Sequence, residues 1–340
     1  MTFDFSFPND LTDLRLRAQF VAEEGVKNFG SYDDSWINGY SKEFSKVLAS
    51  EGWIGMTWPI EHGGGGRPGI ERIIVAEEML KVGAPIAASW VADRQMGPSI
   101  CAYGNEDQQK RFLPDMISGE STWCIGMSEP DSGSDLASLQ TFAKREGDYY
   151  IVNGQKIWTS IAAISEYCYL IVRTSNEGPP HRGLSELIVP MDTEGIEVRT
   201  IVDSVRNEHF CEIFFTDVKV PVENLVGEEN NAFSQTMSQL ENERGGIDRL
   251  MSNWLLFEKA CKAADLENPV VRQEIAKLET GYRIGRILVY KGALGQSLKG
   301  FSAATKAFCT EHEQKVANFA ARILGVGAIA GPSLEQGIAY

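Results

Sequence analysis

The sequence predicts an α+β protein of several domains, in which a helical region, a β-rich region and a second helical region follow one another. Three observations support this. The chain has 340 residues, more than one ordinary core accommodates. Apolar residues recur at helical spacing before about residue 120 and after about residue 228. Between these positions the apolar period falls to two, so we expect domains at residues 1–120, 121–228 and 229–340.

The N-terminal region contains four stretches with the signals of helices. The first, NDLTDLRLRAQFVAEEGVKNF, opens with Asn9 or Asp10 as a capping residue and repeats apolar residues at helical spacing. The same spacing recurs in SKEFSKVLASEG and in GIERIIVAEEMLKVGA, where glycine marks the end of each helix. A shorter helix with a polar cap is predicted for NEDQQKRFLPDMISGE.

The central region reads as short strands. The run YYIVNGQKIWTS contains Asn153-Gly154 between β-forming residues, which is typical of a hairpin turn. Further β-branched or aromatic runs are YCYLIVRTS, ELIVPMD, IEVRTIV and CEIFFTDVKV. Six or seven strands in about a hundred residues predict a compact barrel or sandwich. After them, AFSQTMSQLENERGGIDRLMSNWLLFEKACKAA is predicted to be one long amphipathic helix, with two more helical stretches behind it.

Composition narrows the classes of function. Hydrophobic residues make up 43% of the chain and charged residues 23%, which indicates a globular protein. The net charge is −15, from 47 acidic and 32 basic residues, so nucleic acid is not an expected partner. Six scattered cysteines without a CxxC pair, and four scattered histidines, indicate free thiols in a reducing cytoplasm and no metal site. We expect neither a signal peptide nor a membrane span.

The stretch CIGMSEPDSGSD, residues 124–135, is unusually rich in small and polar residues. Its glycines and serines, among them Gly126, Gly133 and Ser134, let backbone N–H groups approach an oxyanion closely, and Ser128 adds a hydroxyl. The alternative interpretation is an ordinary polar turn between strands.

A second stretch, NGQKIWTS, places Trp158 beside two hydroxyl residues, Thr159 and Ser160. A tryptophan in this setting can cover one face of a flat heteroaromatic ring while the hydroxyls bond its edge. The alternative is that Trp158 belongs to the core of the β-domain.

Together these stretches resemble the acyl-CoA dehydrogenase family. The run GMSEPDSGSDLAS, residues 126–138, is similar to the signature of that family, and its spacing to NGQKIWTS also agrees. EGWIGMTWPIEHGGGG upstream and FFTDVKVPVENLVGEEN downstream resemble other family segments. The resemblance extends from about residue 10 to about residue 330 and implies an N-terminal helical domain, a central β-barrel or sandwich and a C-terminal four-helix bundle.

The resemblance also implies FAD as the cofactor and an acyl-CoA thioester as the substrate. In the family an α-proton is abstracted while a β-hydrogen leaves as hydride to flavin N5, giving the trans-2-enoyl-CoA. The matching positions that would line the flavin or lie near the pyrophosphate come from the two stretches above. They are Ile125, Met127, Ser128, Gly133, Ser134, Trp158, Thr159 and Ser160.

The candidate base lies in SQLENERGGIDRL. Most relatives take this glutamate from a segment ahead of a Gly-Thr-Ser-Glu motif, which this sequence lacks, whereas a minority take it from the first bundle helix, just before an arginine. Glu241 and Glu243 compete, and on a helix they lie about 200° apart. An apolar stripe through Phe233, Met237, Leu240 and Ile247 passes through Glu243, whereas Glu241 shares a polar face.

An apolar setting raises the pKa of a carboxyl toward the working range of a base, so Glu243 is the expected catalytic residue. Arg244 would touch the CoA portion, as the resemblance implies, and Glu241 is the other candidate substrate-binding residue. The alternative interpretation of this segment is a solvated charge run on an ordinary helix.

Two segments depart from the family. An Arg-x-x-Phe-Gly stretch that reaches the FAD of a neighbouring subunit is replaced by LENPVVRQEIAKLE, in which Arg272 is the candidate substitute. A Gln-x-x-Gly-Gly-x-Gly stretch appears only as ARILGVGA. The ENER form and these variant stretches resemble the branch that acts on bulky acyl-CoAs, including steroid side chains, sometimes as two-chain assemblies. The resemblance thus implies a homotetramer or an α2β2 heterotetramer.

The expected electron acceptor is an electron-transfer flavoprotein. Two alternatives remain open from sequence alone. One is an acyl-CoA oxidase or flavin monooxygenase of the same fold, and the other is a non-catalytic subunit that completes the FAD site of a partner.

Overall fold

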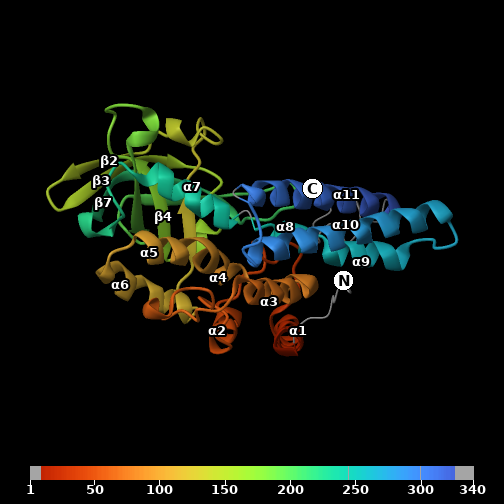
Figure 1. Cartoon of the computed structure of the whole chain (residues 1–340). Coiled ribbons are helices and arrows are strands. Elements are labelled where there is room, and N and C mark those ends of the chain that lie inside the picture. Colours follow the sequence, from red (N-terminus) through yellow and green to blue (C-terminus); the bar gives the residue numbers. More distant parts are fainter. Residues whose placement is uncertain (1–8, 244, 299, 326–340) are drawn as a thin grey trace. The chain divides into compact units, whose positions relative to one another are not determined.

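The computed structural model describes residues 9–243, 245–298 and 300–325, and Figure 1 shows the succession of their helices and strands. Helices occupy the chain up to Ile117, strands lie between Trp123 and Val226, and helices return from Ala232. This succession confirms the predicted fold class, with N-terminal helices, a central sheet domain and a C-terminal helical domain. The predicted domain boundaries, at residues 120 and 228, stay a prediction.

The described residues form two compact units, each taken here by itself. The sheet unit comprises residues 45–65 and 88–243. The helical unit comprises residues 9–44, 66–87, 245–298 and 300–325. The N-terminal helices are therefore shared between the two units, a division that the apolar spacing along the sequence does not reveal.

The sheet unit is built on one mixed sheet. In the described part of the chain its strands run in the order β6-β7-β3-β2-β4-β5-β8, and β1 pairs with β4 in parallel. The strands are β1 (Trp123–Gly126), β2 (Phe142–Glu146), β3 (Tyr149–Lys156), β4 (Tyr167–Arg173), β5 (Leu184–Pro190), β6 (Ile196–Ile201), β7 (Phe210–Pro221) and β8 (Leu225–Val226).

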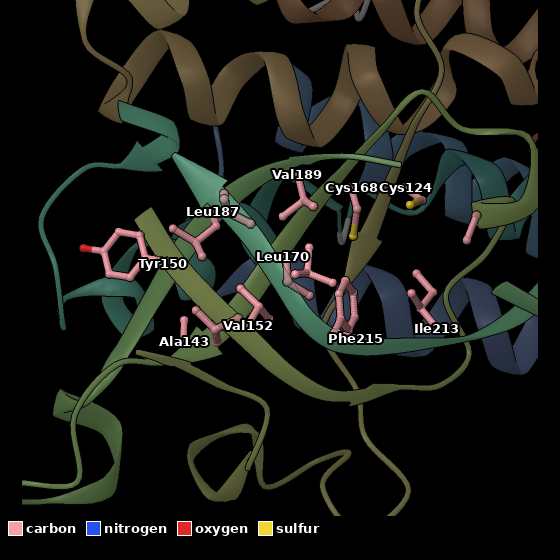
Figure 2. Close-up of a cluster of buried hydrophobic side chains, with 14 of the residues drawn as sticks. Cys124, Ala143, Tyr150, Val152, Cys168, Leu170, Leu187, Val189, Ile213 and Phe215 are labelled. Atoms are coloured by element: carbon pink, nitrogen blue, oxygen red, sulfur yellow. The ribbon is translucent and has the colours of Figure 1, made fainter. Parts of the chain in front are cut away.

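Alternate side chains of these strands form a buried core, which Figure 2 shows in close-up. Tyr150 and Val152 of β3 point into it together with Leu170 of β4 and Leu187 of β5. Successive residues of a strand point to opposite faces, so the period of two in the sequence marks this side of the sheet. The core fixes the strands whose ends carry the two sequence motifs.

The predicted hairpin at Asn153-Gly154 is wrong. Both residues lie inside β3, and the turn that joins β2 to β3 is Gly147-Asp148. Gly154 has φ +148° at a shift in the register between β3 and β7, and a Cβ there would come within 2.6 Å of the Thr141 Cα. Glycine is therefore required by a bulge and a close backbone approach, which the Asn-Gly pair alone does not distinguish from a turn.

The sheet unit also contains helices. They are α5 (Gly97–Tyr103), α6 (Glu106–Ile117) and α7 (Ala232–Glu243), and α5 is preceded by α4 (Ala87–Val91) and a π-helical segment, Ala92–Met96. The start of α6 is fixed by a capping box, in which the Asn105 side chain accepts from the Gln108 backbone N–H and the Gln108 side chain accepts from that of Asn105. Figure 1 shows α7 beside the sheet, and it is the helix on which the candidate base was placed.

The helical unit contains α1 (Asn9–Phe29), α3 (Gly69–Val82), α8 (Ile247–Met251), α9 (Trp254–Ala263), α10 (Pro269–Ala293) and α11 (Phe301–Leu324), and α2 (Lys42–Ser50) begins in it. The prediction of a single long helix after residue 231 is wrong. The helix α7 ends at Glu243, and α8 starts after Gly246, whose φ is +82°. A residue in the left-handed region cannot continue an α-helix.

A buried carboxylate joins three helices of the helical unit. Glu77 of α3 is fully buried and lies 3.1 Å from the Arg15 guanidinium of α1 and 2.6 Å from that of Arg286 on α10. The Tyr290 hydroxyl donates to the same carboxylate at 2.5 Å. Two cations and a hydroxyl offset the desolvation of Glu77, so this cluster holds α1, α3 and α10 together.

Candidate functional site

The backbone brings the two sequence motifs into contact. The N–H of Ile157, one residue after β3, donates to the C=O of Ser128, two residues after β1, at 2.9 Å. Residues 127–141, which we call the β1–β2 loop, therefore lie against the segment that carries Trp158, Thr159 and Ser160. This juxtaposition is what the spacing of the motifs led us to expect.

A buried ion pair pins the β1–β2 loop. Lys156, fully buried at the end of β3, donates from Nζ to Glu129 Oε1 at 2.9 Å and to the C=O of Met127 at 3.0 Å. The Glu129 carboxylate also accepts from the backbone N–H groups of Gln140, at 2.6 Å, and Thr141, at 2.8 Å. One carboxylate therefore closes the loop on itself and ties both of its ends to β3.

The pKa values of this pair show how burial and attraction compete. Burial lowers the pKa of Lys156 to about 8, with Glu129 opposing the shift. Burial alone would raise the pKa of Glu129, but Lys156 and the loop N–H groups outweigh it and hold the pKa below its usual value. Both groups are charged at neutral pH, and removing either one leaves the other buried without its counter-charge.

An arginine holds the end of the same loop. Arg173, the last residue of β4, donates from Nε to the C=O of Leu139 at 3.0 Å and from Nη2 to that of Ala137 at 2.6 Å. Within the loop the Ser132 hydroxyl donates to the Asp135 C=O at 2.7 Å. Backbone groups of the loop are thus held in place by side chains of two strands, β3 and β4.

The segment after β3 carries backbone strain. Trp158 and Ile161 have φ values of +60° and +57°, a region that side chains with a Cβ rarely occupy. The neighbouring turns are held by Thr159 N–H to Cys211 C=O at 3.0 Å and Ile161 N–H to His209 C=O at 2.6 Å. Such strain persists only where surrounding contacts enforce it, and it concentrates at functional sites.

Strain leaves Trp158 and Thr159 in opposite environments. Trp158 is 56% exposed and meets Phe210 edge-on, so the interpretation of Trp158 as core is wrong. Thr159 is buried, and its hydroxyl has no hydrogen-bond partner in the described part of the chain. An exposed indole next to an unsatisfied buried hydroxyl is the arrangement expected of a site that receives a flat polar ring.

The remaining residues expected around the cofactor also lie on these two segments. Ile125 is half-buried on β1, Met127 and Ser128 are half-buried just after it, and Ser160 is half-buried beside Thr159. Gly133 and Ser134 are exposed. A Cβ placed on Gly133 would meet nothing within 4 Å, so the backbone there is open to a ligand.

The buried face of α7 differs from the expected apolar stripe. Gln235, Thr236 and Gln239 are buried, whereas Met237 is 38% exposed. These polar residues turn inward because they bond a buried carboxylate, Glu186 on β5. The stripe of apolar residues predicted from the sequence therefore does not coincide with the buried face of α7.

Three site residues lie at the limit of the described chain. Glu241 and Glu243 belong to α7 by their backbone, but their side chains lie outside the described residues, as does Arg244. Arg272 is in the first turn of α10 in the helical unit, where its guanidinium donates to the C=O groups of Leu266, at 2.6 Å, and Glu267, at 3.1 Å. Its role toward a neighbouring subunit stays a prediction.

Three family models together match most of the chain. Residues 13–120 match the family model of the acyl-CoA dehydrogenase N-terminal domain, residues 124–218 that of the middle domain, and residues 233–338 that of the C-terminal domain. Acyl-CoA dehydrogenase IpdE1 of Mycobacterium tuberculosis (strain ATCC 25618 / H37Rv) is 34% identical over 279 residues, 80% of this chain and 71% of that protein.

Two solved structures are similar throughout. The Tcur3481-Tcur3483 steroid ACAD has a TM-score of 0.85 and 32% identity, covering 99% of this chain and 90% of the other. The ChsE4-ChsE5 complex from Mycobacterium tuberculosis has a TM-score of 0.83 and 29% identity, covering 96% and 87%. With the joined motifs and the strained Trp158 segment, these matches identify the chain as a member of the acyl-CoA dehydrogenase family of FAD-dependent oxidoreductases.

Proposed function

We propose that the chain oxidises a bulky acyl-CoA thioester to its trans-2-enoyl-CoA, with Glu243 as the base that removes the α-proton. The observation that supports a functional cofactor site in this chain is the Thr159 hydroxyl, which is buried beside the exposed Trp158 and has no partner among the described residues. A buried hydroxyl is expected to be hydrogen-bonded, so this unsatisfied group fits a ligand that supplies the acceptor or donor.

The residues present fit FAD. Trp158, Thr159 and Ser160 would hold one side of the ring system, and Ile125, Met127 and Ser128 the other. The open backbone at Gly133 and the Ser134 hydroxyl would meet the pyrophosphate, because small residues allow N–H groups to approach an anion. When bound, the flavin supplies the acceptor for the hydride that leaves the β-carbon.

The proton step belongs to α7. Position 243 follows Gln239 by four residues and, on a regular helix, would share its side, whereas position 241 is about 200° away from Gln239. The side of α7 that carries Gln239 therefore supports Glu243 over Glu241, independently of the apolar stripe predicted from the sequence. Arg244 would bind the CoA portion through a charge-assisted contact, with Glu241 as a second substrate contact.

The relatives support a substrate class and an assembly for this proposal. A steroid ACAD and a two-chain complex are both similar to this chain over nearly its whole length. We propose a bulky, steroid-derived acyl group, a homotetramer or α2β2 heterotetramer, and an electron-transfer flavoprotein as acceptor. All six cysteines are free thiols, which supports a reducing cytoplasm. No helix within the described ranges is long and apolar enough to cross a membrane.

Anaerobic titration of the purified, assembled protein tests this function. We expect released FAD in the denatured supernatant and bleaching of the bound flavin by an acyl-CoA from a panel that includes steroid side-chain thioesters. Rapid peroxide formation in air would favour an oxidase instead. A colourless protein that acquires no flavin on reconstitution would overturn the proposal in favour of a non-catalytic subunit.

Thr159→Val is expected to separate cofactor binding from folding. The variant removes a buried hydroxyl that no described residue bonds, so the cofactor-free chain should unfold at the same denaturant concentration as wild type or a higher one. FAD affinity should fall about tenfold, equivalent to the loss of one hydrogen bond. Urea unfolding and fluorescence titration of FAD measure the two quantities, and equal FAD affinity would remove Thr159 from the site.

A further inference from the structure

A buried carboxylate lies between the sheet and α7 without a counter-ion among the residues that the structure describes. Glu186 of β5 is 0% exposed. Its oxygens accept four hydrogen bonds, from the hydroxyls of Tyr169 and Thr236, both at 2.8 Å, and from the amides of Gln235, at 2.7 Å, and Gln239, at 3.2 Å. Apart from Tyr169 on β4, every donor is on α7.

The three helix donors share one side of α7 and lie close to its end. Gln235, Thr236 and Gln239 occupy helical positions i, i+1 and i+4, which together span about 100° around the helix axis. Glu243, the last residue of α7, comes one turn later, about 6 Å along the axis and rotated by about 40° from Gln239. Whatever fixes Gln239 against the sheet therefore fixes the backbone that carries position 243.

We propose that Glu186 is a positioning residue for the proton-abstraction step, in which its carboxylate fixes the last turns of α7 on β5 and so sets the place of Glu243. The inference rests on the proposed function of Glu243 and deepens it. Proton transfer requires the base within hydrogen-bond reach of the substrate carbon, and a shift of about 1 Å far from the chemistry can cost about 100-fold in rate.

A carboxylate suits this role because it only accepts hydrogen bonds. All four donors must point toward Glu186, which gives the interface one arrangement instead of several. A glutamine at this position would present an NH2 group to the two donors on one side, either Tyr169 and Gln235 or Thr236 and Gln239. The hydroxyl on that side could accept from this NH2, but the amide of Gln235 or Gln239 could not, so that amide would have to flip or turn away. α7 would then lose part of its attachment while the volume stays the same.

The ionisation of Glu186 sets the conditions of a test. Burial raises the pKa of Glu186 to about 6, opposed by the hydrogen bonds from Tyr169, Thr236 and Gln235. Burial likewise raises the pKa of Tyr169 well above its usual value, with Tyr103 as the other titratable group nearby. At pH 8 Glu186 is therefore a carboxylate and Tyr169 a neutral donor, so the full network is present.

Stopped-flow reduction of the holoenzyme by its acyl-CoA at pH 8 tests the proposal. We expect Glu186→Gln to lower the rate constant of flavin reduction by about 10- to 100-fold while the substrate Kd and the FAD content stay within about twofold of wild type. Hydrogen exchange should accelerate in peptides covering residues 232–243 and not in those covering β3 and β7.

Two matched substitutions, each of which removes one hydroxyl oxygen, distinguish a specific effect on α7 from a general loss of stability. Tyr169→Phe removes one donor to Glu186, whereas Tyr150→Phe removes a donor to Glu229, which precedes α7, and both tyrosines are buried in the same sheet. We expect slower reduction only in Tyr169→Phe. This pair also serves if Glu186→Gln does not fold.

Unchanged reduction in both Glu186→Gln and Tyr169→Phe, or an equal loss in Tyr150→Phe, would overturn the positioning role and leave the proposed function intact. If Glu243→Gln reduces the flavin as fast as wild type, the base is elsewhere and both proposals fall together. If Glu243→Gln reduces the flavin slowly while Glu186→Gln reduces it at the wild-type rate, only the positioning role of Glu186 fails and Glu243 remains the base.

Discussion

Glu243→Gln is expected to lower the rate constant of flavin reduction by acyl-CoA at least about 100-fold, because the amide keeps the volume of the side chain and cannot accept the α-proton. FAD content and thermal stability should remain near wild type, since the change leaves no cavity. Anaerobic stopped-flow bleaching measures the rate constant, and extraction of the flavin measures the content.

Glu241→Gln is the matched control for this change. It is the same substitution two residues earlier, on the side of α7 about 200° away, and we expect nearly wild-type reduction. Arg244→Ala in the same assay should weaken substrate binding by about 1.5–3 kcal/mol and flavin binding less. If Glu241→Gln loses activity and Glu243→Gln retains it, the base is Glu241. If both retain it, the base is not on α7.

Lys156→Met is expected to destabilise the sheet unit by about 3–5 kcal/mol and to release FAD, because it leaves the Glu129 carboxylate buried without its cation. Glu129 also fixes the N–H groups of Gln140 and Thr141, so the loop that would hold the cofactor should loosen with it. Urea unfolding followed by circular dichroism gives the change in free energy, and flavin absorbance gives the occupancy.

Two further variants isolate the buried pair. Lys144→Met breaks the exposed pair of Lys144 with Glu146 on β2, at 2.7 Å, and should leave the free energy of unfolding nearly unchanged. Lys156→Met combined with Glu129→Gln should recover part of the loss, because no unpaired charge then remains. Equal effects of Lys144→Met and Lys156→Met would show that burial of the pair is irrelevant to the loop.

The sequence predicts the parts of this fold that depend on local pattern. Helical spacing and capping residues place α1, α3 and α6, and the period of two places the strands. The predictions at Asn153-Gly154 and after Glu243 are wrong, because the backbone freedom of glycine allows a turn, a bulge or the end of a helix. Which of these forms depends on Thr141 and on the rest of the fold, far away in the sequence.

The candidate site shows the same limit. Its two motifs are recognisable because their spacing and residue types are local, yet the residues that hold them were not foreseen. Glu129 and Lys156 stand inside the quoted motifs, and their opposite charges were the available signal. Glu186 gives no such signal, because its partners on α7 are 49 to 53 residues away and are neutral.

The strand β6 lies at the edge of the sheet, where a strand of another molecule could add to it. Among the described strands β6 pairs only with β7, so one side of its backbone lacks a strand partner. Ile196 and Val198 pack against the core, while Glu197 and Arg199 alternate with them and pair at 2.8 Å. An added strand from another molecule would have to dehydrate both charges. We therefore expect these two side chains, both outside the site, to oppose edge-to-edge aggregation.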